Sequence, residues 1–140
     1  WAADTANFGL VEAVIGATPF GGGTARLAAR AGLGRAAEAV YTARIYDAQT
    51  MLDWGVVQRV VPADDLLAKS RALADQLAAG PTRAHQATSA VLNAWAEGGV
   101  ALADATLRQV APPVLVTEDL QAGVESLLAD GPGQATFVGR

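Results

Sequence analysis

Apolar side chains recur along this chain mostly at helical spacing, and the pattern predicts a largely helical protein. The clearest helix runs from about Asp64 to Ala79, where leucines and alanines line one side. Further helices are predicted at 25–31, 36–43, 48–54, 81–97, 99–111 and 118–130. Strand character is confined to two segments: 6–9, which is predicted to be the end of a short strand, and 56–62, which is rich in β-branched valine and closes on Pro62.

Glycines, prolines and short polar side chains mark the boundaries of these elements. Thr24, Asp47 and Thr117 are the predicted N-caps of three helices, because their side chains can accept backbone N–H bonds. The segment 16–23 is predicted to be a loop, and a break is predicted at Pro112–Pro113. The segment 131–140 is expected to be an irregular tail.

So few strands cannot close a sheet. The valine-rich strand needs a neighbour, because its ladder N–H and C=O groups must be satisfied. We therefore expect its partner strands to come from elsewhere. The chain also begins with Trp1 rather than Met, which suggests that something upstream is missing.

Composition narrows the possible functions. The 140 residues, 51 % of them hydrophobic, suit one folded domain. A net charge of −4, without any cluster of Lys or Arg, argues against nucleic-acid and anionic-membrane partners. The absence of cysteine and the single histidine exclude thiolate and multi-histidine metal sites. No apolar run approaches the ~18 residues of a membrane span, so a soluble, cytoplasmic protein is expected.

One carboxylate, Glu12, stands in an apolar stretch just ahead of a triple glycine. Burying a carboxylate costs free energy unless the group is paired or used. It is therefore either a structural carboxylate that accepts backbone N–H bonds or a group that does chemistry. The glycines could permit a tight turn or cradle a phosphate at a helix start, and the lack of a nearby Lys favours the turn.

Ten residues between positions 8 and 27 stand at a characteristic spacing: Phe8, Gly9, Glu12, Gly16, Pro19, Gly22, Gly23, Thr24, Arg26 and Leu27. This run resembles the signature of the crotonase superfamily (enoyl-CoA hydratases and isomerases), roughly F-G-x-P-E-x-x-L-G-x-x-P-x-x-G-G-T-x-R-L. Similarity continues through 33–66 and ends in 117–128 and 137–140, which resemble the terminal motifs of the family. The resemblance implies an α/β, crotonase-like fold, with this chain covering its mostly helical C-terminal half and one or two short strands.

The same resemblance implies a site for acyl-CoA thioesters. Glu12 matches a family glutamate that acts as general acid and base, and Pro19, Gly22 and Gly23 fall in the substrate-binding loop. The first glutamate of the family and its oxyanion-hole donors would lie in an N-terminal half, on the same or another chain. No separate cofactor or metal is implied, because coenzyme A is part of the substrate. Residues 1–62 would belong to the α/β core, and residues 63–140 to a helical region for homo-oligomers, a trimer or a dimer of trimers.

Some positions depart from the family or have plainer explanations. Val11 replaces the usual proline before the glutamate, and Leu127 and Asp130 stand where an aromatic and a basic residue commonly approach CoA. Arg26 and Arg30 share a helix face, with a structural or solvated role favoured over a CoA channel. Two functions remain open: an enoyl-CoA hydratase or isomerase, or a non-catalytic crotonase-like fragment with a role in assembly. The sequence alone does not choose between hydration and isomerisation, or define the acyl chain.

Overall fold

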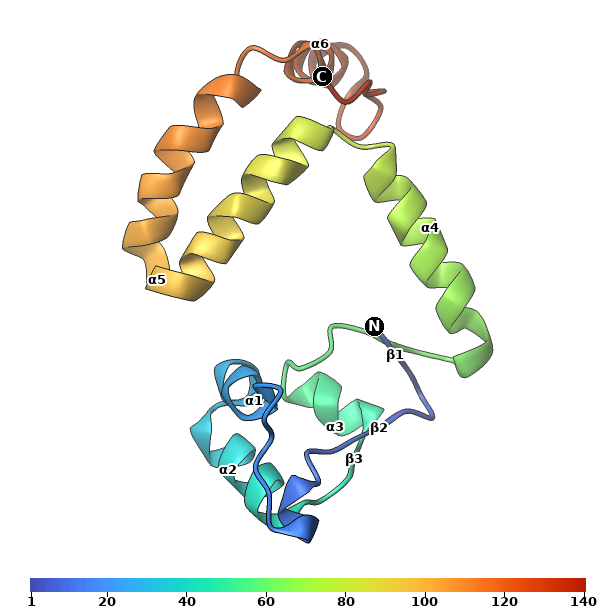
Figure 1. Ribbon diagram of the computed structural model, residues 1–140. Coiled ribbons are helices and arrows are strands. Elements are labelled where there is room, and N and C mark those ends of the chain that lie inside the picture. The colour runs from blue at the N-terminus through green and yellow to red at the C-terminus, as the bar shows by residue number, and fades with distance from the viewer. The chain divides into compact units, whose positions relative to one another are not determined.

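The structure is a computed structural model that describes residues 1–140, and it divides into two compact units (Figure 1). Unit 1 comprises Trp1–Arg71 and unit 2 comprises Ala72–Arg140. The boundary lies inside helix α4 (Leu66–Ala78), later in the chain than the predicted division after residue 62. None of the helices combines the length and the apolar character that crossing a membrane requires.

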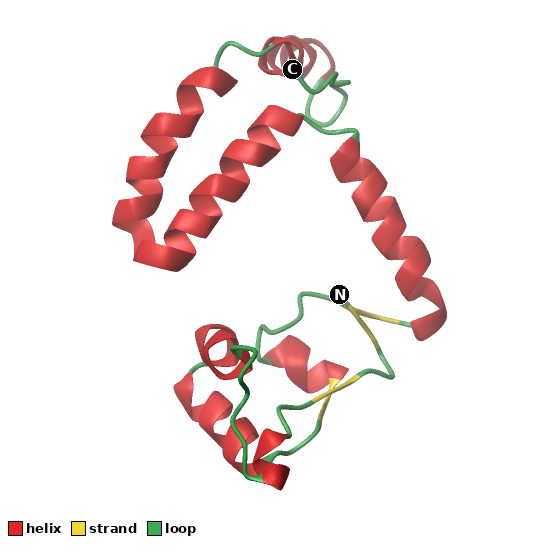
Figure 2. Ribbon diagram, viewed as in Figure 1, coloured by secondary structure: helices red, strands yellow, loops and turns green.

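Unit 1 holds all the strands, each two residues long (Figure 2). β1 (Ala2–Ala3) pairs in parallel with β4 (Val60–Val61), in the register Ala2 to Val60. β2 (Asn7–Phe8) pairs antiparallel with β3 (Tyr46–Asp47), in the register Phe8 to Tyr46. The expectation that the partner of the valine-rich strand comes from elsewhere is therefore wrong for β4, because β1 of the same chain pairs with it.

Short helices fill the rest of unit 1. They are listed here in chain order: the 3-10 helix η1 (Glu12–Ile15), α1 (Gly23–Ala31), α2 (Leu33–Thr42), α3 (Ala48–Asp53) and the 3-10 helix η2 (Ala63–Asp65). Asp47 caps α3 as predicted, since its Oδ1 accepts the Thr50 N–H at 2.8 Å. This backbone hydrogen bond, helped by the Thr50 side chain, lowers the pKa of Asp47. The predicted Thr24 cap is wrong, because Thr24 lies inside α1 and Gly22 precedes the helix instead.

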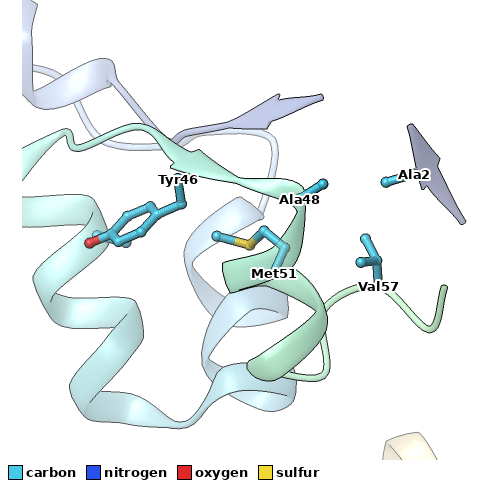
Figure 3. Packing of buried hydrophobic residues seen from close by; sticks show 6 residues of the cluster. Ala2, Tyr46, Ala48, Met51 and Val57 are labelled. Atoms are coloured by element: carbon cyan, nitrogen blue, oxygen red, sulfur yellow. The ribbon is translucent and has the colours of Figure 1, made fainter. Parts of the chain in front are cut away.

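The hydrophobic core of unit 1 is formed by residues of α3 and of the segments that pack against it (Figure 3). Its largest buried side chains are Tyr46 and Met51, which Ala2, Ala39, Ala48 and Val57 surround. Val57 belongs to the segment predicted as a strand, but its N–H and that of Val56 both donate to the Met51 carbonyl as the chain leaves α3. The predicted strand 56–62 is therefore reduced to Val60–Val61.

Unit 2 is helical. α5 (Thr82–Val114) consists of two helical arms that meet at a non-helical kink at Gly98 and Gly99, the latter with φ of +67°, where the chain turns back on itself (Figure 1). The two predicted helices 81–97 and 99–111 are therefore its two arms. The second arm takes in Pro112 and Pro113 and ends at Val114, slightly beyond the predicted break. Thr117 caps α6 (Glu118–Asp130) as predicted, because its Oγ1 accepts the Leu120 N–H at 3.1 Å.

Candidate functional site

Glu12 opens η1, four residues after β2 ends, in unit 1. The pairing of β2 with β3 fixes the chain just before it, and α2 packs against η1. η1 ends at Gly16, whose left-handed backbone (φ of +71°) favours glycine. The Ala17 N–H donates to the Glu12 carbonyl at 3.0 Å, so the main chain of Glu12 is tied into the turn.

One oxygen of the Glu12 carboxylate is buried and unsatisfied. Its Oε2 atom is shielded from solvent and has no hydrogen-bond partner, and no Lys, Arg or His forms an ion pair with it. Buried polar atoms are normally paired, because an unpaired one costs about 1–3 kcal/mol. The Oε2 atom thus accepts no backbone N–H bond, whereas an oxygen of a structural carboxylate would.

Large apolar side chains surround this acid in sequence and remain exposed. Val14 is 76 % exposed, Ile15 82 % and Phe20 85 %. Pro19, between them, is buried. These exposed side chains offer apolar surface, close to Glu12 in the sequence, that another part of a protein or a ligand can cover.

The predicted glycine loop is a tight turn. The Gly22 N–H donates to the Pro19 carbonyl at 3.2 Å, and Gly22 has φ of +78°. Gly23 begins α1 where a Cβ atom would lie 2.6 Å from Leu10 Cδ2. A left-handed backbone and a close approach thus account for the last two glycines.

An apolar cavity of about 260 Å³ lies beside this turn within unit 1. Its walls come from β2 and the residues after it, from α1 and from the core, and include Phe8, Leu10, Leu27 and Met51. Arg26 and Arg30 line it as well, and neither forms an ion pair. Arg26 Nη1 donates instead to the Gly22 carbonyl at 3.2 Å, which braces the turn from α1.

The structure gathers the predicted site residues only in part. Pro19, Gly22 and Gly23 form one turn, but of the four predicted residues only Gly23 lines the cavity. The sequence placed Arg26 and Arg30 on one helix face but did not show what lies beside that face. The structure shows that both arginines line the cavity.

Comparison with known proteins extends these observations. The family model described as enoyl-CoA hydratase/isomerase matches residues 1–127. The chain is 33 % identical over 135 residues to a probable enoyl-CoA hydratase of Mycobacterium bovis, a match that covers 96 % of this chain and 52 % of that protein. It is 36 % identical over 124 residues to a carnitinyl-CoA dehydratase of Proteus mirabilis, covering 86 % of this chain and 48 % of that protein.

Solved structures agree with the sequence matches. A crystal structure of a probable enoyl-CoA hydratase/isomerase from Mycobacterium abscessus superposes with a TM-score of 0.88 at 32 % identity. That match covers 99 % of this chain and 53 % of the other. The chain therefore spans about half the length of the curated relatives and the solved structures that it matches.

Proposed function

The chain belongs to the enoyl-CoA hydratase/isomerase family, and we propose that it supplies the general acid/base, Glu12, of an enzyme acting on acyl-CoA thioesters. The fold is the C-terminal, mostly helical half of a crotonase, as the sequence predicts. Family membership and the unpartnered Oε2 atom favour an enzyme over a non-catalytic fragment with a role in assembly.

In the proposed reaction, Glu12 moves a proton at C2 or C3 of the acyl chain. Its carboxylate is suited to this because one oxygen lacks an internal partner and is free to bond to a substrate or a water. The negative charge that develops on the thioester oxygen would be stabilised by preorganised backbone N–H donors, which we place in the half that this chain does not contain. Hydration uses a water held by two carboxylates, whereas isomerisation can proceed with one.

The loop residues Pro19, Gly22 and Gly23 are proposed to line the substrate path beside Glu12. Their turn is held by the bond from the Gly22 N–H to Pro19 and by the side chain of Arg26. Coenzyme A would enter as part of the substrate, without a separate cofactor. The proposed assembly is a homo-oligomer, a trimer or a dimer of trimers, in the cytoplasm.

Substitution Glu12→Gln in the full-length protein tests the proposal, because it preserves shape while removing the proton-transfer group. Turnover in hydration and isomerisation of an enoyl-CoA series should fall by roughly 10²–10⁴-fold, the usual contribution of one general acid/base. The melting temperature should stay unchanged, since Oε2 has no hydrogen bond to lose.

Glu38→Gln is the matched control. Glu38 is an exposed carboxylate of the same unit, whose Oε1 pairs with Arg44 at 3.2 Å and accepts a hydrogen bond from the Tyr46 hydroxyl at 3.4 Å, a bond that the amide oxygen of Gln can also accept. Its loss should leave turnover intact. Near-normal turnover in Glu12→Gln, or a large fall in its stability without selective loss of rate, would overturn the catalytic assignment.

A further inference from the structure

The last four residues of the chain, Phe137–Arg140, are fastened to the start of α6, and we call this segment the strap. Asp119 Oδ1 accepts the Val138 N–H at 2.7 Å, and Asp119 Oδ2 accepts the Gly139 N–H at 3.0 Å. The Asp119 N–H in turn donates to the Arg140 carbonyl at 3.1 Å. Two family-like motifs, 117–128 and 137–140, thus meet through one residue.

Asp119 is well suited to hold the strap. It is the one buried charged residue of the chain, 2 % exposed, and no cation pairs with it. Backbone N–H groups of the strap therefore supply the partners that a buried carboxylate needs. The ion pair between Arg140 and Glu118, at 3.2 Å, is exposed on both sides and adds little.

The strap also shapes a cavity inside unit 2. An apolar space of about 320 Å³ lies between α5, α6 and Phe137, with Val114, Leu120, Val124 and Leu127 among its walls. The Phe137 ring lies over Gly123, where a Cβ atom would come 3.5 Å from its Cε1. Gly139 lies against Thr82 at the start of α5.

We infer that Asp119 is the latch of this strap: its carboxylate keeps Phe137–Arg140 closed against α6, and loss of that carboxylate frees the strap and opens the cavity while the helices stay folded. The inference is independent of the proposed function. It rests on three hydrogen bonds that all converge on one residue.

Amide hydrogen exchange in the full-length protein tests the latch. In Asp119→Asn, one carboxylate oxygen becomes an NH₂ group that cannot accept a strap N–H. Exchange at Val138 and Gly139 should rise by about tenfold to a hundredfold, since hydrogen bonds to charged groups contribute about 1.5–3 kcal/mol. Amides in the middle of α6 should keep their protection, and binding of an apolar fluorescent dye should increase.

Two further variants make the result decisive. Glu118→Gln removes only the exposed ion pair and should leave exchange in the strap unchanged; an increase equal to that of Asp119→Asn would overturn the latch.

Val138→Pro deletes one donor without touching the buried carboxylate, and it should raise exchange at Gly139 with α6 still protected. If Asp119→Asn unfolds α6, this variant decides: unchanged protection at Gly139 overturns the inference.

Discussion

Each unit contains one carboxylate with an oxygen that is shielded from solvent: Glu12 in unit 1 and Asp119 in unit 2. Glu12 Oε2 has no partner, whereas both oxygens of Asp119 accept backbone N–H bonds. Burial alone therefore does not separate a chemical group from a structural one. The two groups differ instead in how many hydrogen bonds they accept, and the role proposed for Glu12 depends on its unsatisfied oxygen, which could bond to a substrate.

The units also differ in how they use apolar side chains. Unit 1 packs Tyr46, Met51 and Val57 into a core. Unit 2 buries only two apolar residues, Ala94 and Ala103, and leaves larger ones exposed, among them Leu92 at 62 % and Trp95 at 59 %. Both units expose large apolar side chains, but unit 1 also carries a core, whereas unit 2 buries almost no apolar residue. In the proposed homo-oligomer, other subunits would cover the apolar surface of unit 2.

The largest expected effect of this difference is on assembly. The full-length protein should sediment as a trimer or a dimer of trimers. Replacing Leu92 and Trp95 together by Asp should shift it to smaller species, because charges would have to be buried in the subunit contact. Gln86→Asp, an exposed polar position on another face of the same helix, is the control and should leave the size unchanged. A monomeric wild-type protein would refute the proposed assembly.

The core of unit 1 provides the next effect in size. Met51 is 3 % exposed, and Met51→Ala should lower the free energy of unfolding by about 2–5 kcal/mol through lost burial and a residual cavity. Urea unfolding measures the change. Met51→Leu, which nearly conserves volume, should cost less than about 1.5 kcal/mol. Equal stability of Met51→Ala and the wild type would mean that this cluster is not the core that holds unit 1.

Local signals predicted the helices well. The caps Asp47 and Thr117 lie where short polar side chains precede apolar periodicity, and both caps form. Thr24 failed as a cap because the left-handed Gly22 lets α1 begin at Gly23, two residues earlier than the sequence suggests. Boundaries of this kind depend on backbone angles at single glycines, which propensity does not specify.

Long-range pairing was out of reach of the sequence. β4 pairs with β1 across most of unit 1, and no local pattern in Ala2–Ala3 identifies a strand. At the candidate site, the apolar surroundings of Glu12 were visible in the sequence, but its unpartnered oxygen was not. Nothing in the sequence singles out Asp119 among the acids of α6, because its partners lie about twenty residues further along the chain.

The smallest predicted effect is a change in stability from the C-terminal end of α6, the end opposite Asp119. Asp130 is the last residue of that helix, where the carbonyl ends of the helix dipole disfavour negative charge, and no basic residue occupies the last turn. Asp130→Lys in the full-length protein should therefore raise stability by about 0.3–1 kcal/mol at low ionic strength. Asp130→Asn, which removes the charge without reversing it, should give an intermediate gain. Both gains should shrink in 1 M salt, where the screening length is only about 3 Å. Thermal unfolding at the two salt concentrations measures them, and a gain that is the same at both would show that it comes from packing or helix propensity rather than from the charge at the helix end.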